Sequence, residues 1–327
     1  MNEIKFLSVV SPVYKSAECV EVLYQRIQDS LKKFRDNLCY EIIFVEDCGQ
    51  DGSWEKIHDL ALKEPRLKAI KLSRNFGQHS AITAGLNAAM GDWVVVLDCD
   101  LQDPPEEIPR LLHKAMEGYD MVCARRRQRQ DSFWRRSASR IFISILNWFS
   151  GMAYDSQIAN FRVISRSVVD AYSQMGETPP SFGGQLEWLG FHVGYIDIQH
   201  QSRYQGRSSY SFSKLLKVAM RLIVAYSNKP LYVSISVGFF MSFLSIIYAL
   251  YITLRKFFIG TNIDGWASLM VSVWFLSGLL IGNLGIIGLY LGKVYDEVKR
   301  RPVYVIAESV NLGSNESTDR KRGKQGI

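Results

Sequence analysis

Residues 92–106 read DWVVVLDCDLQDPPE. A short apolar run rich in valine ends there at two acidic residues one position apart, Asp98 and Asp100. An apolar run of this length, bounded by polar residues, is typical of a buried strand. Two carboxylates at a strand end offer the oxygen ligands that Mg²⁺ or Mn²⁺ prefers, and such an ion can bridge to a diphosphate. The stretch therefore predicts a buried strand that ends at a metal and diphosphate site.

Apolar, β-branched segments alternate with segments of helical pattern along the first part of the chain. The predicted strands are Phe6–Ser11, Tyr40–Glu46, Leu67–Leu72 and Asp92–Leu97, and the predicted helices are Glu18–Phe34, Ser53–Leu62 and Gln78–Met90. This alternation indicates an α/β fold with a mostly parallel sheet and helices on both faces. Ligands bind such sheets at the carboxyl ends of the strands. We therefore expect the polar residues that follow each strand to form the functional site.

The composition excludes a disordered chain and indicates two membrane helices. Of the 327 residues 47% are hydrophobic, and 39 Lys and Arg stand against 32 Asp and Glu, for a net charge of +7. A chain this apolar can bury a core. Residues 230–254 and 265–292 contain no charged residue. Each run exceeds the roughly 20 residues that cross a bilayer as a helix, and a pair of buried core helices is the alternative.

Basic residues flank the two apolar runs unevenly. Four Lys or Arg residues lie within residues 214–229, before the first run, and four lie within residues 293–301, after the second. The loop between the runs holds only Arg255 and Lys256. The positive-inside rule then predicts a protein of the inner (cytoplasmic) membrane, with the first 210 residues and both termini in the cytoplasm.

Two further segments are predicted to lie at the membrane surface. Seven arginines between positions 125 and 140 are interleaved with Trp, Phe and aliphatic residues up to position 149. This pattern predicts an interfacial helix over about 132–150, with its cations near lipid phosphates. Residues 211–229 predict a second, juxtamembrane amphipathic helix. Nucleic-acid binding is the competing interpretation, and the neighbouring apolar runs favour the membrane instead.

The segments predict an order of domains along the chain. The parts are a Rossmann-like domain over 1–210, the juxtamembrane helix over 211–229, membrane helices over 230–254 and 265–292, and a cytoplasmic tail over 293–327 that is disordered from about residue 313. Arg301–Ala307 could form a terminal strand. Glycines recur at three- and four-residue spacing from Gly278 to Gly292, which allows close helix packing. Packing against the first apolar helix and formation of a homo-oligomer both remain open.

Ordered motifs resemble those of one enzyme family. They are VVSPVY at Val9–Tyr14, VEDCGQDGS at Val45–Ser53, RNFGQ at Arg74–Gln78 with AGLNAAMGD at Ala84–Asp92, and DCDLQDPPE at Asp98–Glu106. Together they resemble family 2 glycosyltransferases of the GT-A fold. RYQGRSSY at Arg203–Tyr210, followed by two apolar runs, makes the chain similar to the polyisoprenyl-phosphate branch, which contains dolichyl-phosphate mannose synthases and bactoprenol glucosyltransferases. The resemblance covers roughly Phe6–Ala307.

The resemblance implies a role for each matching residue. The nucleotide pocket would be lined by Pro12, Tyr14, Glu18, Asp47, Asn75 and Asp98, with Asp47 bonded to the base. The metal, Mg²⁺ or Mn²⁺, would be held by Asp98, Asp100 and Gln102. The acceptor phosphate would be bound by Arg125, Arg203 and Ser209. The catalytic set would be Asp100, Arg125, Arg203 and Asp155.

Three positions depart from the family pattern. Asn160 stands where many relatives have an Asp before Phe-Arg, and an amide cannot accept a proton as a base. Asp155 is close enough in sequence to substitute for it. The usual Asp-Asp-Gly-Ser is Glu46-Asp47-Cys48-Gly49 here, and the usual Tyr-Asn-Glu is Tyr14-Lys15-Ser16. These differences indicate a sub-branch with its own donor or acceptor preference.

The implied reaction is the inverting, metal-dependent transfer of a hexose from a nucleotide sugar, a UDP-sugar in the first place, to undecaprenyl phosphate. The product would serve cell-envelope polysaccharide such as O-antigen, or glycolipid modification, and a flippase would be a partner. One alternative is a mannose synthase that uses GDP-mannose and polyprenyl phosphate. Another is a non-catalytic, nucleotide-sugar-binding membrane scaffold. A processive polysaccharide synthase is disfavoured because the sequence has no Gln-x-x-Arg-Trp motif.

Overall fold

The computed structural model describes residues 4–35, 38–126, 144, 147–149, 157–176, 181–199, 223–224, 227–259 and 265–312. The chain divides into two compact units. The first comprises residues 1–137, 154–209 and 302–327, and the second comprises residues 138–153 and 210–301. The interfacial helix expected over 132–150 and the juxtamembrane helix expected over 211–229 lie almost wholly outside the described residues.

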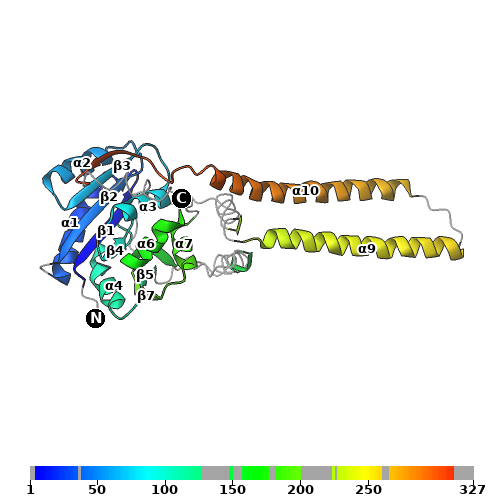
Figure 1. Cartoon of the computed structure of the whole chain (residues 1–327), viewed down its shortest axis with the longest axis horizontal. Coiled ribbons are helices and arrows are strands. Elements are labelled where there is room, and N and C mark those ends of the chain that lie inside the picture. Colours follow the sequence, from blue (N-terminus) through cyan, green and yellow to red (C-terminus); the bar gives the residue numbers. More distant parts are fainter. Residues whose placement is uncertain are drawn as a thin grey trace, which may run out of the picture. The chain divides into compact units, whose positions relative to one another are not determined.

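The described part of the first unit is built on one sheet of eight strands in the order β7-β5-β6-β4-β1-β2-β3-β8 (Figure 1). The strands are β1 (Phe6–Val13), β2 (Cys39–Glu46), β3 (Leu67–Leu72), β4 (Trp93–Val96), β5 (Met121–Arg126), β6 (Ile158–Ser165), β7 (Val193–Ile198) and β8 (Ile306–Val310). Strand β1 pairs parallel with β2 and β4, β2 with β3, and β5 with β7. Strand β6 is antiparallel to β4 and β5, and β8 is antiparallel to β3. The expected α/β fold with a mostly parallel sheet is confirmed.

Helices cover both faces of this sheet and bury a core on each (Figure 1). They are α1 (Val20–Phe34), α2 (Ser53–Lys63), α3 (Gln78–Ala88), the 3₁₀ helix η1 (Pro105–Glu107), α4 (Ile108–Ala115), α6 (Arg166–Met175) and α7 (Phe182–Trp188). Helices α1, α2 and α4 pack on one face, and α3, α6 and α7 pack on the other. The central strands are therefore apolar on both sides, which gives continuous apolar runs rather than alternation. A side chain at Gly85 of α3 would clash with Val10 Cγ1, so only glycine permits this close packing on β1.

The second unit contains the long helices α9 (Lys229–Ile259) and α10 (Trp266–Val298), which run in opposite directions (Figure 1). Both are long and apolar enough to cross a membrane by length and composition, over Lys229–Tyr248 and Ser272–Val298. The sequence predicted helices over 230–254 and 265–292. In the structure α9 continues to Ile259 and α10 continues to Val298. Within the unit the Tyr290 hydroxyl donates to the Ser227 carbonyl at 2.6 Å.

The segment after α10 differs from the expected tail over 293–327. Helix α10 continues to Val298, and Ile306–Val310 form β8 at the edge of the sheet in the first unit. A terminal strand was expected over Arg301–Ala307, and it begins five residues later. The reason is pairing with β3, which sets Val310 opposite Ala69 and Glu308 opposite Lys71. The disorder expected from about residue 313 lies outside the described residues.

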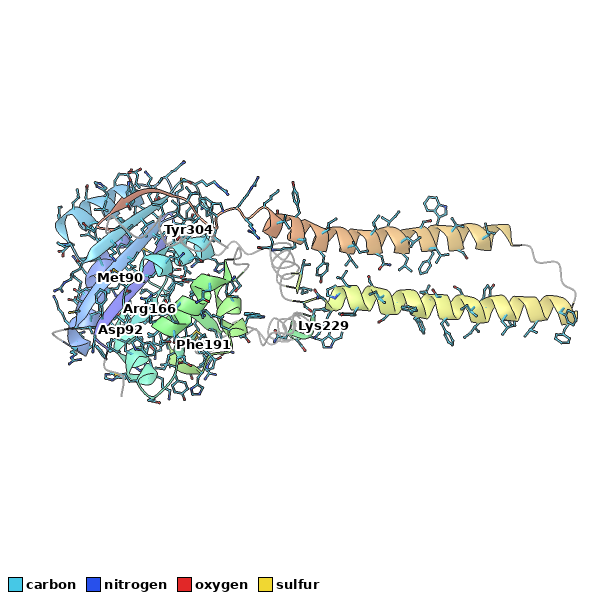
Figure 2. The ribbon with its side chains drawn as sticks, viewed as in Figure 1. Met90, Asp92, Arg166, Phe191, Lys229 and Tyr304 are labelled. Atoms are coloured by element: carbon cyan, nitrogen blue, oxygen red, sulfur yellow. The ribbon has the colours of Figure 1, made fainter. Side chains whose placement is uncertain are left out.

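A buried ion pair fixes the amino-terminal ends of three central strands. Glu41 of β2 is 5% exposed, and its carboxylate lies 2.6 Å from Lys68 Nζ of β3. The same carboxylate accepts from the Ser8 hydroxyl at 2.6 Å and from the Met90 N–H at 2.7 Å. Met90 and Asp92, labelled in Figure 2, flank the turn that leads into β4. The partners of the Glu41 carboxylate come from β3, β1 and the turn before β4, so this buried charge connects β2 to three other parts of the first unit.

Replacing Lys68 by Met should destabilise the protein strongly, because it leaves the Glu41 charge buried without its cation. Breaking a buried pair from one side costs about 3 kcal/mol, which corresponds to a fall in Tm of roughly 6–12 °C. Thermal unfolding of the detergent-solubilised protein measures the change. The double variant Lys68→Met/Glu41→Met should recover most of the loss, and Lys114→Met, at an exposed pair with Glu117, should change the Tm little. An unchanged Tm in Lys68→Met would contradict this role.

Candidate active site

The loops that follow β1, β2 and β4 meet at one edge of the sheet. The register sets Val13 at the end of β1 beside Glu46 at the end of β2, and the Asp47 N–H donates to the Val13 carbonyl at 2.9 Å. A side chain at Gly49 would lie 2.8 Å from the Lys15 backbone nitrogen. Glycine at position 49 therefore allows the first two loops to touch. The residues expected at the nucleotide pocket lie at the ends of strands or in the loops that follow them.

Each of these three loops holds residues in the left-handed backbone region that are not glycine. They are Lys15 after β1, Cys48 and Gln50 after β2, and Leu101 after β4, with φ between 51° and 59°. Such a conformation is typically destabilised by about 1 kcal/mol or more and persists only where surrounding contacts fix it. Leu101 is 4% exposed and packs in the core, which anchors the turn directly after Asp100. Backbone strain of this kind clusters at functional sites.

Asp98 lies in a crowded and negatively charged place. Its Oδ1 accepts from Gln78 Nε2 at 2.6 Å, and Asn160 Nδ2 lies 3.4 Å from both carboxylate oxygens. Burial of the carboxyl raises the pKa of Asp98 to about 7, and the nearby charges of Asp100 and Asp103 act in the same direction. A carboxyl group under these conditions is stabilised in its ionised form by a bound cation. Gln78 and Asn160 hold it in place, and a carboxylate has about four acceptor positions in all.

Asp100 and the residues after it form a compact turn. Asp100 Oδ1 accepts from the Gln102 backbone N–H at 3.1 Å, so Gln102 contributes its backbone to this turn. Asp103 is fully buried and forms an ion pair with Arg126 of β5 at 3.1 Å. Among these residues the sequence analysis missed Gln78, Asp103 and Arg126. Gln78 is the last residue of the RNFGQ motif and Asp103 lies within the DCDLQDPPE motif, so both carried a signal.

The two arginines at the end of β5 point to opposite sides of the sheet. Arg126 faces Asp103, whereas Arg125 Nε donates to Asp197 Oδ1 of β7 at 2.7 Å. Successive side chains of a strand alternate between faces, which separates the pair. Arg125 was expected at the acceptor phosphate, and here it is half-exposed and bound to a carboxylate. Arg126 is the arginine that the structure places beside the acidic turn.

Asp47 is 2% exposed and organises the turn between β3 and α3. Its two carboxylate oxygens accept from the backbone N–H groups of Phe76 at 2.7 Å and Gly77 at 2.9 Å. Burial raises its pKa, and the two hydrogen bonds oppose that rise. The expected contact of Asp47 with a nucleobase stays a prediction. It is compatible with these bonds, because a carboxylate offers about four acceptor positions.

The remaining expected residues divide into two groups. Pro12 is buried at the end of β1, whereas Tyr14, Glu18 and Asn75 are exposed in the loops at the same edge. Residues Asp155, Arg203 and Ser209 lie outside the described residues, and their expected roles stay predictions.

A buried arginine next to the site was not identified from the sequence. Arg162 of β6 is 3% exposed and donates to the backbone carbonyls of Ala159 at 2.9 Å and Asn160 at 3.1 Å. Its guanidinium packs on the Phe182 ring at 5.0 Å. Burial, together with the Arg162 charge, lowers the pKa of His79, whose Nδ1 accepts from the Phe182 N–H at 3.4 Å. Arg162 thus fixes the strand that carries Asn160 and the start of α7.

The residues present fit a divalent cation whose coordination is completed by substrate. Among the described residues no group of three or more His, Cys, Asp or Glu side chains could hold a metal ion. Mg²⁺ is usually bound through one or two carboxylates together with water and substrate phosphates. Asp98 and Asp100 supply two carboxylates, and burial of Asp98, with the neighbouring charges of Asp100 and Asp103, raises its pKa to about 7. The donor set therefore suits a metal that arrives with a phosphorylated ligand.

Comparison with known proteins identifies the family to which this chain belongs. The profile of "Glycosyl transferase family 2" matches residues 8–173. YkcC of Bacillus subtilis (strain 168), an uncharacterised glycosyltransferase, is 35% identical over 93% of this chain and 94% of its own. The chain therefore belongs to glycosyl transferase family 2. The expected GT-A fold class and the expected enzyme class, a glycosyltransferase, are both confirmed.

Two further proteins are similar to this chain. The SfII prophage-derived bactoprenol glucosyl transferase of Shigella flexneri is 33% identical over 93% of this chain and 98% of its own. A solved glucosyl-3-phosphoglycerate synthase of Mycobacterium tuberculosis, in complex with Mn²⁺, uridine diphosphate and phosphoglyceric acid, aligns with a TM-score of 0.47 at 17% identity. That alignment covers 67% of this chain and 76% of the synthase.

Replacing Arg126 by Met should destabilise the acidic turn, because Asp103 is fully buried and would lose its cation. The expected cost is about 3 kcal/mol of unfolding free energy. Arg125→Met is the matched control one residue away, since its half-exposed pair with Asp197 contributes about 1 kcal/mol or less. Thermal unfolding of the two variants side by side measures the difference. Equal losses, or a larger loss in Arg125→Met, would contradict the assignment of Arg126 to this turn.

Proposed function

We propose that this chain transfers a hexose from a nucleotide sugar to the phosphate of a polyprenyl phosphate, with inversion at the sugar. The observation that carries the proposal is the Asp98 and Asp100 pair that follows β4, in which Gln78 and Asn160 hold Asp98. Membership of family 2 and the likeness to a bactoprenol glucosyl transferase across 93% of the chain support it. The candidate membrane helices α9 and α10 suit a lipid acceptor.

The chain's own residues bind and orient the donor. Asp98 and Asp100, with Gln102 beside them, would hold Mg²⁺ or Mn²⁺, which when bound offsets the negative charge of the departing diphosphate. Pro12, Tyr14, Glu18, Asn75 and Asp47 would line the nucleotide, and UDP is the proposed nucleotide. Gln78 and Asn160 keep the Asp98 carboxylate in one orientation. Positioning of this kind supplies much of the rate when the reacting groups are held close together.

The acceptor needs no strong base. A phosphate monoester with a second pKa near 6 is largely ionised at pH 7, so its oxygen can attack the anomeric carbon directly. Asn160 agrees with this, because its amide donates toward Asp98 and cannot take up a proton. Arg125, Arg203 and Ser209 are the proposed phosphate ligands, and a guanidinium can bond two phosphate oxygens at once. Asp155 is the proposed additional catalytic residue.

We further propose undecaprenyl phosphate as the acceptor and the cytoplasmic face of the inner membrane as the location, with both termini in the cytoplasm. The lipid-linked sugar would then be moved by a flippase and used to modify envelope polysaccharide such as O-antigen, or glycolipid. A homo-oligomer is compatible with the glycine spacing in α10. The alternatives are a mannose synthase that uses GDP-mannose and a non-catalytic nucleotide-sugar-binding scaffold.

A panel of donors separates these alternatives. Purified full-length protein is incubated with undecaprenyl phosphate, Mg²⁺ or Mn²⁺, and each of several UDP- and GDP-hexoses, and glycolipid is detected by chromatography and mass spectrometry. We expect a glycolipid from a UDP-hexose. Product from GDP-mannose alone would favour the mannose synthase. The absence of product from every donor, with nucleotide-sugar binding retained, would favour the scaffold and contradict the proposal.

Replacing Asp100 by Asn should reduce transfer by at least about 100-fold, because it removes a charged ligand at the point where negative charge develops. Chelation of divalent ions should have a similar effect on the wild-type protein, and added Mg²⁺ or Mn²⁺ should reverse it. Asp59→Asn, on the exposed side of α2, removes the same charge away from the site and should leave the rate unchanged. Full activity of Asp100→Asn would refute the proposed role of the acidic pair.

A further inference from the structure

Residues 304–311, which we name the C-terminal clamp, follow α10 and return to the sheet of the first unit. Strand β8 lies within the clamp and pairs antiparallel with β3. A bulge interrupts the pairing between Lys71 and Leu72. Just beyond this bulge the clamp continues along the turn that follows β3, where the Ser73 N–H donates to the Val305 carbonyl at 2.9 Å. The clamp therefore contacts the first residue of the turn that leads into α3.

The clamp also holds the far end of α3. The Tyr304 hydroxyl, on a residue labelled in Figure 2, accepts from Asn87 Nδ2 at 2.9 Å. Asn87 lies in the last turn of α3, and its Oδ1 in turn accepts from the Ser173 hydroxyl of α6 at 3.0 Å. Tyr304 and Ile306 pack against the core on the α3 face of the sheet. The turn before α3 and the end of α3 are thus both attached to the same short segment.

The other half of the clamp is anchored on the opposite face. Glu308 lies 2.8 Å from Lys71 Nζ of β3 and accepts from the Trp54 indole N–H of α2 at 3.2 Å. Asn311 Nδ2 donates to the backbone carbonyls of Ala61 at 2.7 Å and Leu67 at 2.8 Å, with its own backbone in the left-handed region at φ 61°. These contacts fix the register of β8. Val305 and Tyr304 are therefore held at set positions beside the turn and α3.

The turn and helix that the clamp contacts, residues 73–88, supply hydrogen-bond partners for Asp47 and Asp98 of the proposed donor site. The turn that begins at Ser73 supplies the Phe76 and Gly77 N–H groups that bind Asp47. Helix α3 begins with Gln78, which donates to Asp98 at 2.6 Å. Asn75, in the middle of this turn, is exposed. Movement of the turn or of α3 would therefore shift the partners of two aspartates at once.

We propose that the C-terminal clamp is a positioning element for the donor site, and that the segment following the second apolar helix sets the affinity for the nucleotide sugar. The clamp acts through Ser73 and Asn87 on the turn and helix that orient Asp47 and Asp98. This inference rests on the proposed function, because the affected ligand is the nucleotide-sugar donor of that site. The competing role is purely structural, in which β8 only covers the exposed edge of β3.

The two roles predict different kinetics. Tyr304→Phe removes one hydroxyl and keeps the ring in the core, so the fold is retained while the bond to Asn87 is lost. Glu308→Gln removes the charge that fixes the register of β8. We expect each variant to raise the KM for the nucleotide sugar about 3- to 10-fold, the effect of losing one hydrogen bond, with kcat changed less than about 2-fold. Glu117→Gln, which breaks the exposed pair with Lys114, is the matched control and should change neither constant.

Amide hydrogen exchange gives a second measurement that needs no catalysis. In the wild-type protein the backbone N–H groups of Phe76 and Gly77 donate to Asp47. In both clamp variants the hydrogens of these two amides should exchange with solvent faster, while the Tm stays unchanged. An unchanged KM together with unchanged amide exchange at residues 73–77 would overturn the proposed positioning role of the clamp. Strand β8 would then serve only to cover the edge of β3. If the wild-type protein makes no glycolipid from any donor, the proposed function fails, and the exchange of these amides still decides whether the clamp positions the turn.

Discussion

The site depends on the placement of two carboxylates, Asp98 and Asp100, at the end of a strand that is buried on both faces. Burial of Asp98 raises its pKa to about 7, and the neighbouring charge of Asp100 acts in the same direction, so a bound cation would stabilise the ionised pair. The surrounding structure maintains this arrangement through Gln78 and Asn160 on one side of the sheet and the Asp103–Arg126 ion pair on the other. Strained loops and buried polar contacts gather around these two carboxylates.

Much of the fold could be predicted from the sequence, because the first four strands are continuous apolar runs separated by helical patterns. The Asp98–Asp100 pair could be placed at the sheet edge for the same reason. The side-chain partners could not, because they depend on register and on contacts between distant segments. Arg125 and Arg126 are neighbours in sequence, yet strand alternation sends Arg125 to Asp197 and Arg126 to Asp103. β8 was misplaced because its bounds are set by pairing with β3, more than two hundred residues earlier.

Family membership and local chemistry contribute different parts of the account. The family profile and the relatives identify a glycosyltransferase. The geometry adds which residues orient the acidic pair and which segment holds them: Gln78 from α3, Asn160 from β6, and the C-terminal clamp that fixes both ends of α3. The chain passes through both apolar helices before it forms the clamp. We propose that donor binding depends on this segment, which follows both apolar helices in the sequence.

We propose that the Asp98–Asp100 pair binds the donor diphosphate through a divalent ion. Electron paramagnetic resonance of Mn²⁺, titrated into the purified full-length protein with and without UDP, tests it directly. We expect a protein–Mn²⁺–UDP complex to form cooperatively and to be lost in a folded Asp98→Asn/Asp100→Asn double variant. Tight UDP binding that persists in this variant, or that is unaffected by removal of divalent ions, would contradict it.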